Sequence, residues 1–200
     1  GDDDVARDDL KKWKIPGSSI AIERIEAGPR AGEFLFSAWT VQRIPRFYLQ
    51  VKHLPYKSDA VRGIYKQYLG SKKTLDYLES QIRNRLKPID NTTPRSTLNG
   101  FLDSVNRAYA IVMETNAALK ADPPSMTIEE ARNAEKKALH LMDRAVATLD
   151  LSKVPKAIRG DVGTEATLQL KEVMDRMMLP LLDSVPDMEM VMAERDRLGK

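Results

Sequence analysis

Few residues in this 200-residue chain have the types and spacing that catalysis requires. The chain has no cysteine, which removes disulfides, thiolate nucleophiles and cysteine-based zinc sites. Its histidines, His53 and His140, are far apart and in no zinc-binding spacing. Carboxylates occur in pairs such as Glu129 and Glu130, but acids on amphipathic helices normally form the solvated face. We therefore expect no catalytic residue, no metal ligand, no cofactor and no enzymatic activity.

The segment around the turn at residues 28–32 is the most distinctive in the chain. Alternating residues 18–25 precede it and Phe34 and Phe36 follow it, which predicts a β-hairpin with a tight turn. It is not a phosphate-binding loop, because it lacks the Gly-Lys-Ser/Thr ending and opens a strand instead of a helix. It gives the candidate interaction motif, which consists of Gly28, Pro29, Arg30, Gly32, Glu33 and Phe34.

Arg30 has two interpretations. It reaches back to Glu33 or Glu26 and holds the hairpin together, or it docks onto another subunit or onto lipid headgroups. The methionines near the end of the chain also have two roles: we expect Met174 and Met177 to fill the core, and residues 188–192 to face a partner or a missing segment.

Composition limits the classes of protein. Hydrophobic residues make up 42% and charged residues 30%, which is typical of a globular domain. The formal net charge is only +3 and the charges are interspersed, so we expect no nucleic-acid partner. The acidic run Asp2–Asp4 lacks the ligand spacing of a cation site and is expected to be a solvated lead-in.

The elements that must position these residues are mostly helices. Apolar residues at helical spacing predict helices over 37–54, where Pro45 should cause a kink or restart, and over 61–69 and 74–86. Thr93-Pro94 predicts the start of a long helix that stops at Asp122-Pro123-Pro124. Thr127 and Glu130 form a capping box that opens the next helix. A third long helix is expected from Pro155 to Leu179, followed by a short methionine-rich helix.

We therefore predict a mainly α protein, an antiparallel helical bundle with one small β-hairpin packed against it. Residues 1–70 would hold the hairpin and short helices, and residues 74–200 the bundle. Together they would form one compact domain, with 70–74 as a linker or join.

Several sequence strings resemble the extramembrane N-terminal region of bacterial proteins of the small-conductance mechanosensitive channel family. The strings are spread along most of the chain: Ile15-Pro16-Gly17, Gly28-Pro29-Arg30-x-Gly32-Glu33-Phe34-Leu35-Phe36-Ser37, Leu54-Pro55-Tyr56, Thr93-Pro94-Arg95-Ser96-Thr97-Leu98, Leu149-Asp150-Leu151-Ser152 and Leu170-Lys171-Glu172-Val173-x-Asp175-Arg176.

The resemblance implies a non-catalytic regulatory or interaction domain on the periplasmic side, tethered to the inner membrane in the full-length protein. Its partners would be other protomers or membrane segments of the same channel, or lipid headgroups. In the family the helical strings come first, whereas here the order is reversed. The chain is then circularly permuted, or its numbering does not follow the native chain. Gly1 and Lys200 should accordingly lie close together or be separated by a flexible gap.

An alternative function is a small-molecule-binding or enzymatic helical domain with a pocket between the bundle and the hairpin. Convergence of Arg30, Glu33 or His53 on a deep pocket would favour this alternative. A flat apolar or methionine-lined surface would favour an interaction domain.

Overall fold

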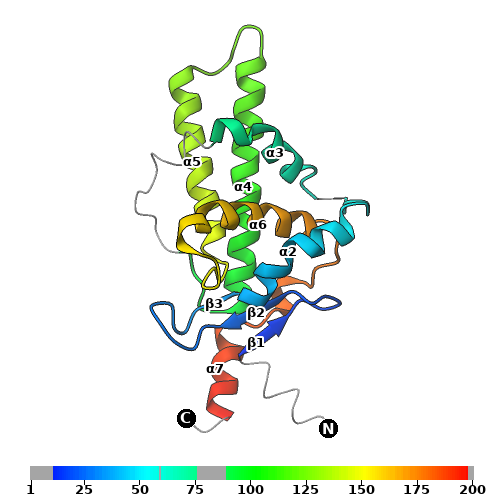
Figure 1. Cartoon of the computed structure of the whole chain (residues 1–200), viewed down its shortest axis with the longest axis vertical. Helices are drawn as coiled ribbons and strands as arrows, with labels where there is room; N and C mark the ends of the chain where they lie inside the picture. The colour runs from blue at the N-terminus through cyan, green and yellow to red at the C-terminus, as the bar shows by residue number, and fades with distance from the viewer. Residues whose placement is uncertain (1–10, 59, 76–88, 198–200) are drawn as a thin grey trace.

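A small sheet lies at one end of a long helical pair in the computed structural model, which describes residues 11–58, 60–75 and 89–197 (Figure 1). The helices are α2 (Ala38–Val51), α3 (Ile64–Leu75), α4 (Pro94–Lys120), α5 (Ile128–Val146), α6 (Arg159–Met174) and α7 (Met188–Arg197), with 3₁₀ turns η2 (Lys156–Ile158) and η3 (Leu182–Ser184). The strands are β1 (Lys12–Lys14), β2 (Ala21–Arg24) and β3 (Phe34–Phe36). The predicted fold class, mainly helical with a small antiparallel sheet packed on the helices, is confirmed.

The sheet has three strands in the order β1-β2-β3, so the predicted hairpin is its second half. Strand β1 was not predicted; Lys12 opens it and pairs with Glu23. The two side chains also form a 2.6 Å ion pair, which makes a charged strand compatible with the sheet edge. Phe36 lies opposite Ile22 and packs edge-on against Phe101 of α4, with ring centroids 5.2 Å apart.

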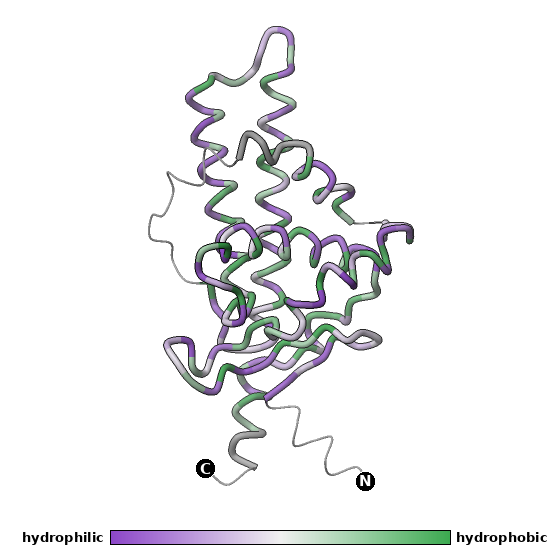
Figure 2. Tube along the Cα trace, viewed as in Figure 1, coloured by the Kyte–Doolittle hydropathy of each residue, from purple (hydrophilic) through white to green (hydrophobic). Residues whose placement is uncertain are grey.

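The predicted caps of α4 and α5 are confirmed. The side chain of Thr93 accepts a hydrogen bond from the backbone of Ser96, and that of Thr127 accepts one from the backbone of Glu130. The two helices that begin at these caps form a long antiparallel pair whose polar and apolar residues alternate along both members (Figure 2). This alternation is the amphipathic pattern that the sequence predicted.

Other boundaries differ from the prediction. Ser37 caps α2, and this helix includes Pro45 without a restart. Helix α3 runs through residues 70–74, where the composition predicted a linker or join. The third long helix ends at Met174 instead of near Leu179. The expected helix at 74–86 beyond Leu75, and the expected proximity of Gly1 and Lys200, lie outside the described residues.

Helix α6 crosses the α4–α5 pair and does not extend it as a third parallel member (Figure 1). From Ala166 to Met174 every residue of α6 is buried, so this helix lies among the other elements on all sides. Gly163 makes the approach possible, since a Cβ there would lie 2.7 Å from Cγ1 of Val146. Helix α6 therefore carries polar side chains, among them Lys171 and Glu172, into the interior.

Candidate functional site

The predicted motif at residues 28–34 forms a closed turn between β2 and β3. Gly28 and Gly32 both have φ of 92°, a conformation that side-chain-bearing residues rarely adopt. The amide of Gly32 donates to the carbonyl of Ile25 at 2.8 Å, and the amide of Ile25 donates to the carbonyl of Glu33 at 2.8 Å. The glycines are therefore required by backbone geometry, while Pro29 is exposed at the tip.

Arg30 holds this turn against the helices. Its Nη2 donates to Oε2 of Glu33 at 2.6 Å and also to the carbonyl of Ala147 at 2.6 Å, just after α5 ends. Asn91 Nδ2 donates to the same carboxylate at 3.2 Å. The first interpretation of Arg30, as a side chain that holds the hairpin, is confirmed for the partner Glu33; Glu26 instead pairs with Lys11.

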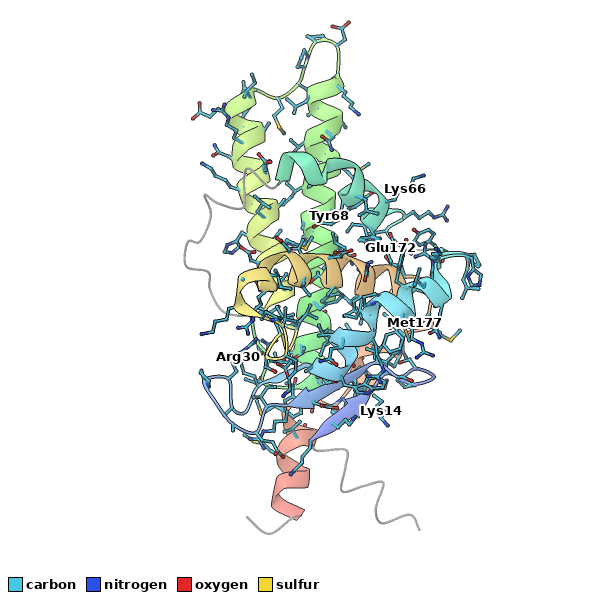
Figure 3. All side chains as sticks on the ribbon, viewed as in Figure 1. Lys14, Arg30, Lys66, Tyr68, Glu172 and Met177 are labelled. Carbon is cyan, nitrogen blue, oxygen red and sulfur yellow. The ribbon has the colours of Figure 1, made fainter. Side chains whose placement is uncertain are left out.

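The electrostatics of Glu33 follow from these contacts. The hydrogen bond from Arg30 lowers the pKa of the Glu33 carboxyl, and the Asn91 amide lowers it further against the opposing effect of burial. The pair lies partly exposed at the molecular surface, where Figure 3 labels Arg30. The motif is therefore a charged latch between the turn and the end of α5.

Phe34 ends the motif inside the core. Its side chain is buried, its amide donates to the carbonyl of Asn91 at 2.6 Å, and its carbonyl accepts from the hydroxyl of Thr97 at 2.6 Å. These contacts join β3 to the start of α4. Of the six motif residues, Phe34 is thus a core residue and not part of an exposed surface.

A second cluster of polar side chains surrounds the buried carboxylate of Glu172 on α6. The side chain of Glu172 is only 2% exposed. Its Oε2 accepts from the hydroxyl of Tyr56 at 2.7 Å and from the guanidinium of Arg176, and its Oε1 accepts from the amide of Tyr65 at 3.1 Å. The carboxylate therefore fastens the segment after α2 and the start of α3 onto α6, in the region that Figure 3 labels.

Arg176 completes this fastening. Its guanidinium lies 3.7 Å from the ring centroid of Tyr56, and its Nε donates to the carbonyl of Leu54 at 3.2 Å. Burial, followed by the hydrogen bond to Glu172, raises the pKa of the Tyr56 hydroxyl. The phenol thus acts as a neutral hydrogen-bond donor.

Tyr65 extends the cluster along α6. Its hydroxyl donates to Oε1 of Glu165 at 2.5 Å and accepts from Nε2 of Gln169 at 2.9 Å. Burial and the neighbouring carboxylate raise the pKa of Tyr65 to about 12. Oε1 of Gln169 is buried without a hydrogen-bond partner among the described residues.

Lys171 and Asp175 form a further buried ion pair on α6, with 2.5 Å between Nζ and Oδ1. Burial lowers the pKa of Lys171 and raises that of Asp175, and in each case the charge of the partner opposes the shift. The carbonyl of Asp175 accepts from the amide of Lys57 at 2.9 Å, so this pair also adjoins the segment after α2.

Sequence reasoning assigned no role to this cluster. The available signal was two pairs of opposite charges four residues apart, Lys171 with Asp175 and Glu172 with Arg176, next to apolar residues. The same spacing describes an ordinary solvated pair such as Asp103 with Arg107, so only the packing of α6 distinguishes the two cases.

Arg30, Glu33 and His53, the residues expected to converge on a binding pocket, do not converge. Arg30 and Glu33 bond to each other, whereas His53 is exposed in the turn after α2 and has no hydrogen bond to either. In the part of the chain that the structure describes, no group of histidine and acidic side chains could hold a metal ion. Within the same residues no helix has the length and apolarity needed to cross a bilayer.

Comparisons with protein-family models, with curated proteins and with solved structures found no match for this chain.

Proposed function

We propose that this chain is a non-catalytic regulatory or interaction domain of a membrane protein similar to the small-conductance mechanosensitive channels. It would lie on the extracytoplasmic side, tethered to the inner membrane in the full-length protein. Other protomers or membrane segments of that protein would be its partners.

The observation that carries the proposal is that the strings on which the resemblance rests contact one another. The amide of Asp150 donates to the carbonyl of Phe36 at 2.9 Å, which joins the Leu149 string to the Gly28–Ser37 string. Tyr56 donates to Glu172, which joins the Leu54-Pro55-Tyr56 string to the string on α6. Strings from both halves therefore belong to one folded unit, as expected if they come from one ancestral domain.

The polar clusters favour a structural or interaction role over catalysis. Each carboxylate oxygen of Glu172 already accepts a hydrogen bond from the protein, and the latch formed by Arg30 joins elements of the fold. Exposed apolar side chains occur in the C-terminal segment, where Met188, Met190 and Met192 are 40–47% exposed, while Met174 is fully buried as predicted. Flexible exposed methionines are common at partner surfaces.

The location can be tested with a single introduced cysteine, because this chain has none of its own. Lys136 is exposed on α5, so K136C in a full-length protein freed of other cysteines should react with a membrane-impermeant maleimide in intact spheroplasts. A cytoplasmic protein with an exposed cysteine is the control and should react only after lysis. Labelling of K136C only after lysis would contradict the extracytoplasmic location.

A further inference from the structure

Helix α2 lies in the longest part of the described chain that carries basic but no acidic residues. Between Glu33 and Asp59 there is no aspartate or glutamate, while Arg43, Arg46, Lys52 and Lys57 all occur there. In contrast, the basic residues of α5 are interspersed with glutamates. The local charge around α2 is therefore positive although the chain as a whole is nearly neutral.

The outer face of α2, formed by Trp39, Arg43, Arg46 and Leu49, combines this charge with exposed apolar side chains. Helical spacing places these residues opposite the buried Thr40, Val41 and Ile44.

Trp39 is 44% exposed and Leu49 is 59% exposed. The guanidinium of Arg43 lies 4.0 Å from the ring centroid of Trp39, so the cation stacks on the indole at the surface.

The cations of this face are available to an external partner. Arg43 and Arg46 form no ion pair with any residue in the described ranges. Beyond the end of α2, the exposed apolar residues are Leu54, which is 43% exposed, and Met178, which is 88% exposed. The carbonyl of Leu54 accepts a hydrogen bond from Arg176, which places the segment around Met178 next to Leu54. Figure 3 shows Met177 in the same region. Exposed apolar side chains thus continue past the helix.

We propose that the outer face of α2 docks on an anionic phospholipid bilayer. Interfacial helices of this kind place tryptophan and leucine at the headgroup boundary, while arginine and lysine attract anionic lipids. A nucleic acid would satisfy the cations but would leave Leu49 and the neighbouring apolar side chains exposed. The proposal rests on the proposed function, because only a domain held beside a membrane would use such a face.

The test is co-sedimentation of the purified chain with phosphatidylcholine vesicles that contain or lack phosphatidylglycerol. We expect binding to the anionic vesicles that weakens as salt rises, together with a blue shift of tryptophan fluorescence that W39F abolishes. Each cation near such a surface contributes roughly fivefold to the partition coefficient, so R43Q/R46Q should bind about 25-fold more weakly.

The matched control is R132Q/K136Q, which removes the same charge from exposed positions of α5 and should bind like the wild type. Equal binding of the unmodified chain to neutral and anionic vesicles would overturn the proposal without any variant. An equal loss of vesicle binding in R43Q/R46Q and R132Q/K136Q would also overturn it. If RNA binding is measured in parallel, a loss of affinity for RNA in R43Q/R46Q with unchanged affinity for vesicles would overturn it as well. Vesicle binding is independent of the cysteine-labelling result, so failure of this inference and failure of the proposed function are distinguishable.

Discussion

Replacing Glu172 by glutamine tests whether the buried cluster on α6 holds the fold together. E172Q keeps the side-chain volume but removes the charge that faces the guanidinium of Arg176, whose side chain is only 5% exposed. Removing one partner of a buried ion pair typically costs about 3–5 kcal/mol, because the other charge stays buried without compensation. We expect a loss near the lower limit, about 3 kcal/mol, since the amide oxygen can still accept from Tyr56.

The assay is urea unfolding followed by circular dichroism. With a slope of about 2 kcal/mol per molar urea, a loss of about 3 kcal/mol lowers the midpoint by about 1.5 M. The matched control is D103N on α4, where Asp103 and Arg107 have the same spacing and order but side chains 48% and 56% exposed. Because solvent screens such a pair, this change should cost no more than about 0.5 kcal/mol.

A double variant separates the ion pair from the other contacts of Glu172. E172Q/R176M removes both charges, so its loss of unfolding free energy should be smaller than the sum of the two single losses by about 2 kcal/mol. The reasoning would be refuted if E172Q lost less than about 1 kcal/mol, or if the two single losses were additive.

Two further predictions concern α6 and the latch. In G163A the new Cβ would lie 2.7 Å from Cγ1 of Val146, so this change should lower the free energy of unfolding by about 1–3 kcal/mol in thermal melts. The control G160A, where a Cβ meets open space, should raise the free energy of unfolding by about 0.5 kcal/mol. Similar effects of the two changes would contradict the close approach of α6. Because Arg30 lowers the pKa of Glu33 in the folded state, the latch should stabilise the protein above the ordinary carboxyl pKa of about 4.3 and lose this contribution as pH falls through the lowered value. R30Q should flatten that part of the stability profile measured by urea unfolding against pH, and parallel profiles for R30Q and the wild type would show that the ion pair contributes nothing.

The sequence predicted those parts of the fold that depend on neighbours along the chain. The caps at Thr93 and Thr127 are local hydrogen bonds between residues three apart, so residue type and spacing were sufficient. The turn at Gly28 and Gly32 was predicted for the same reason, since its positive φ values require glycine. Strand β1 was missed because Lys12, Trp13 and Lys14 become a strand only by pairing with β2.

The sequence by itself also indicated two nearby carboxylates, Glu33 and Glu26, as partners for Arg30, and the structure selects Glu33, three residues away. Only the tertiary structure decided that Arg30 also reaches the carbonyl of Ala147, and that Glu172 and Arg176 are buried under Tyr56. The physical reason is that charges four residues apart on a helix look alike in the sequence whether water or protein surrounds them. Because α6 crosses through the interior, protein surrounds these charges, and an ordinary pattern of helix charges becomes one of the contacts that join both halves of the chain.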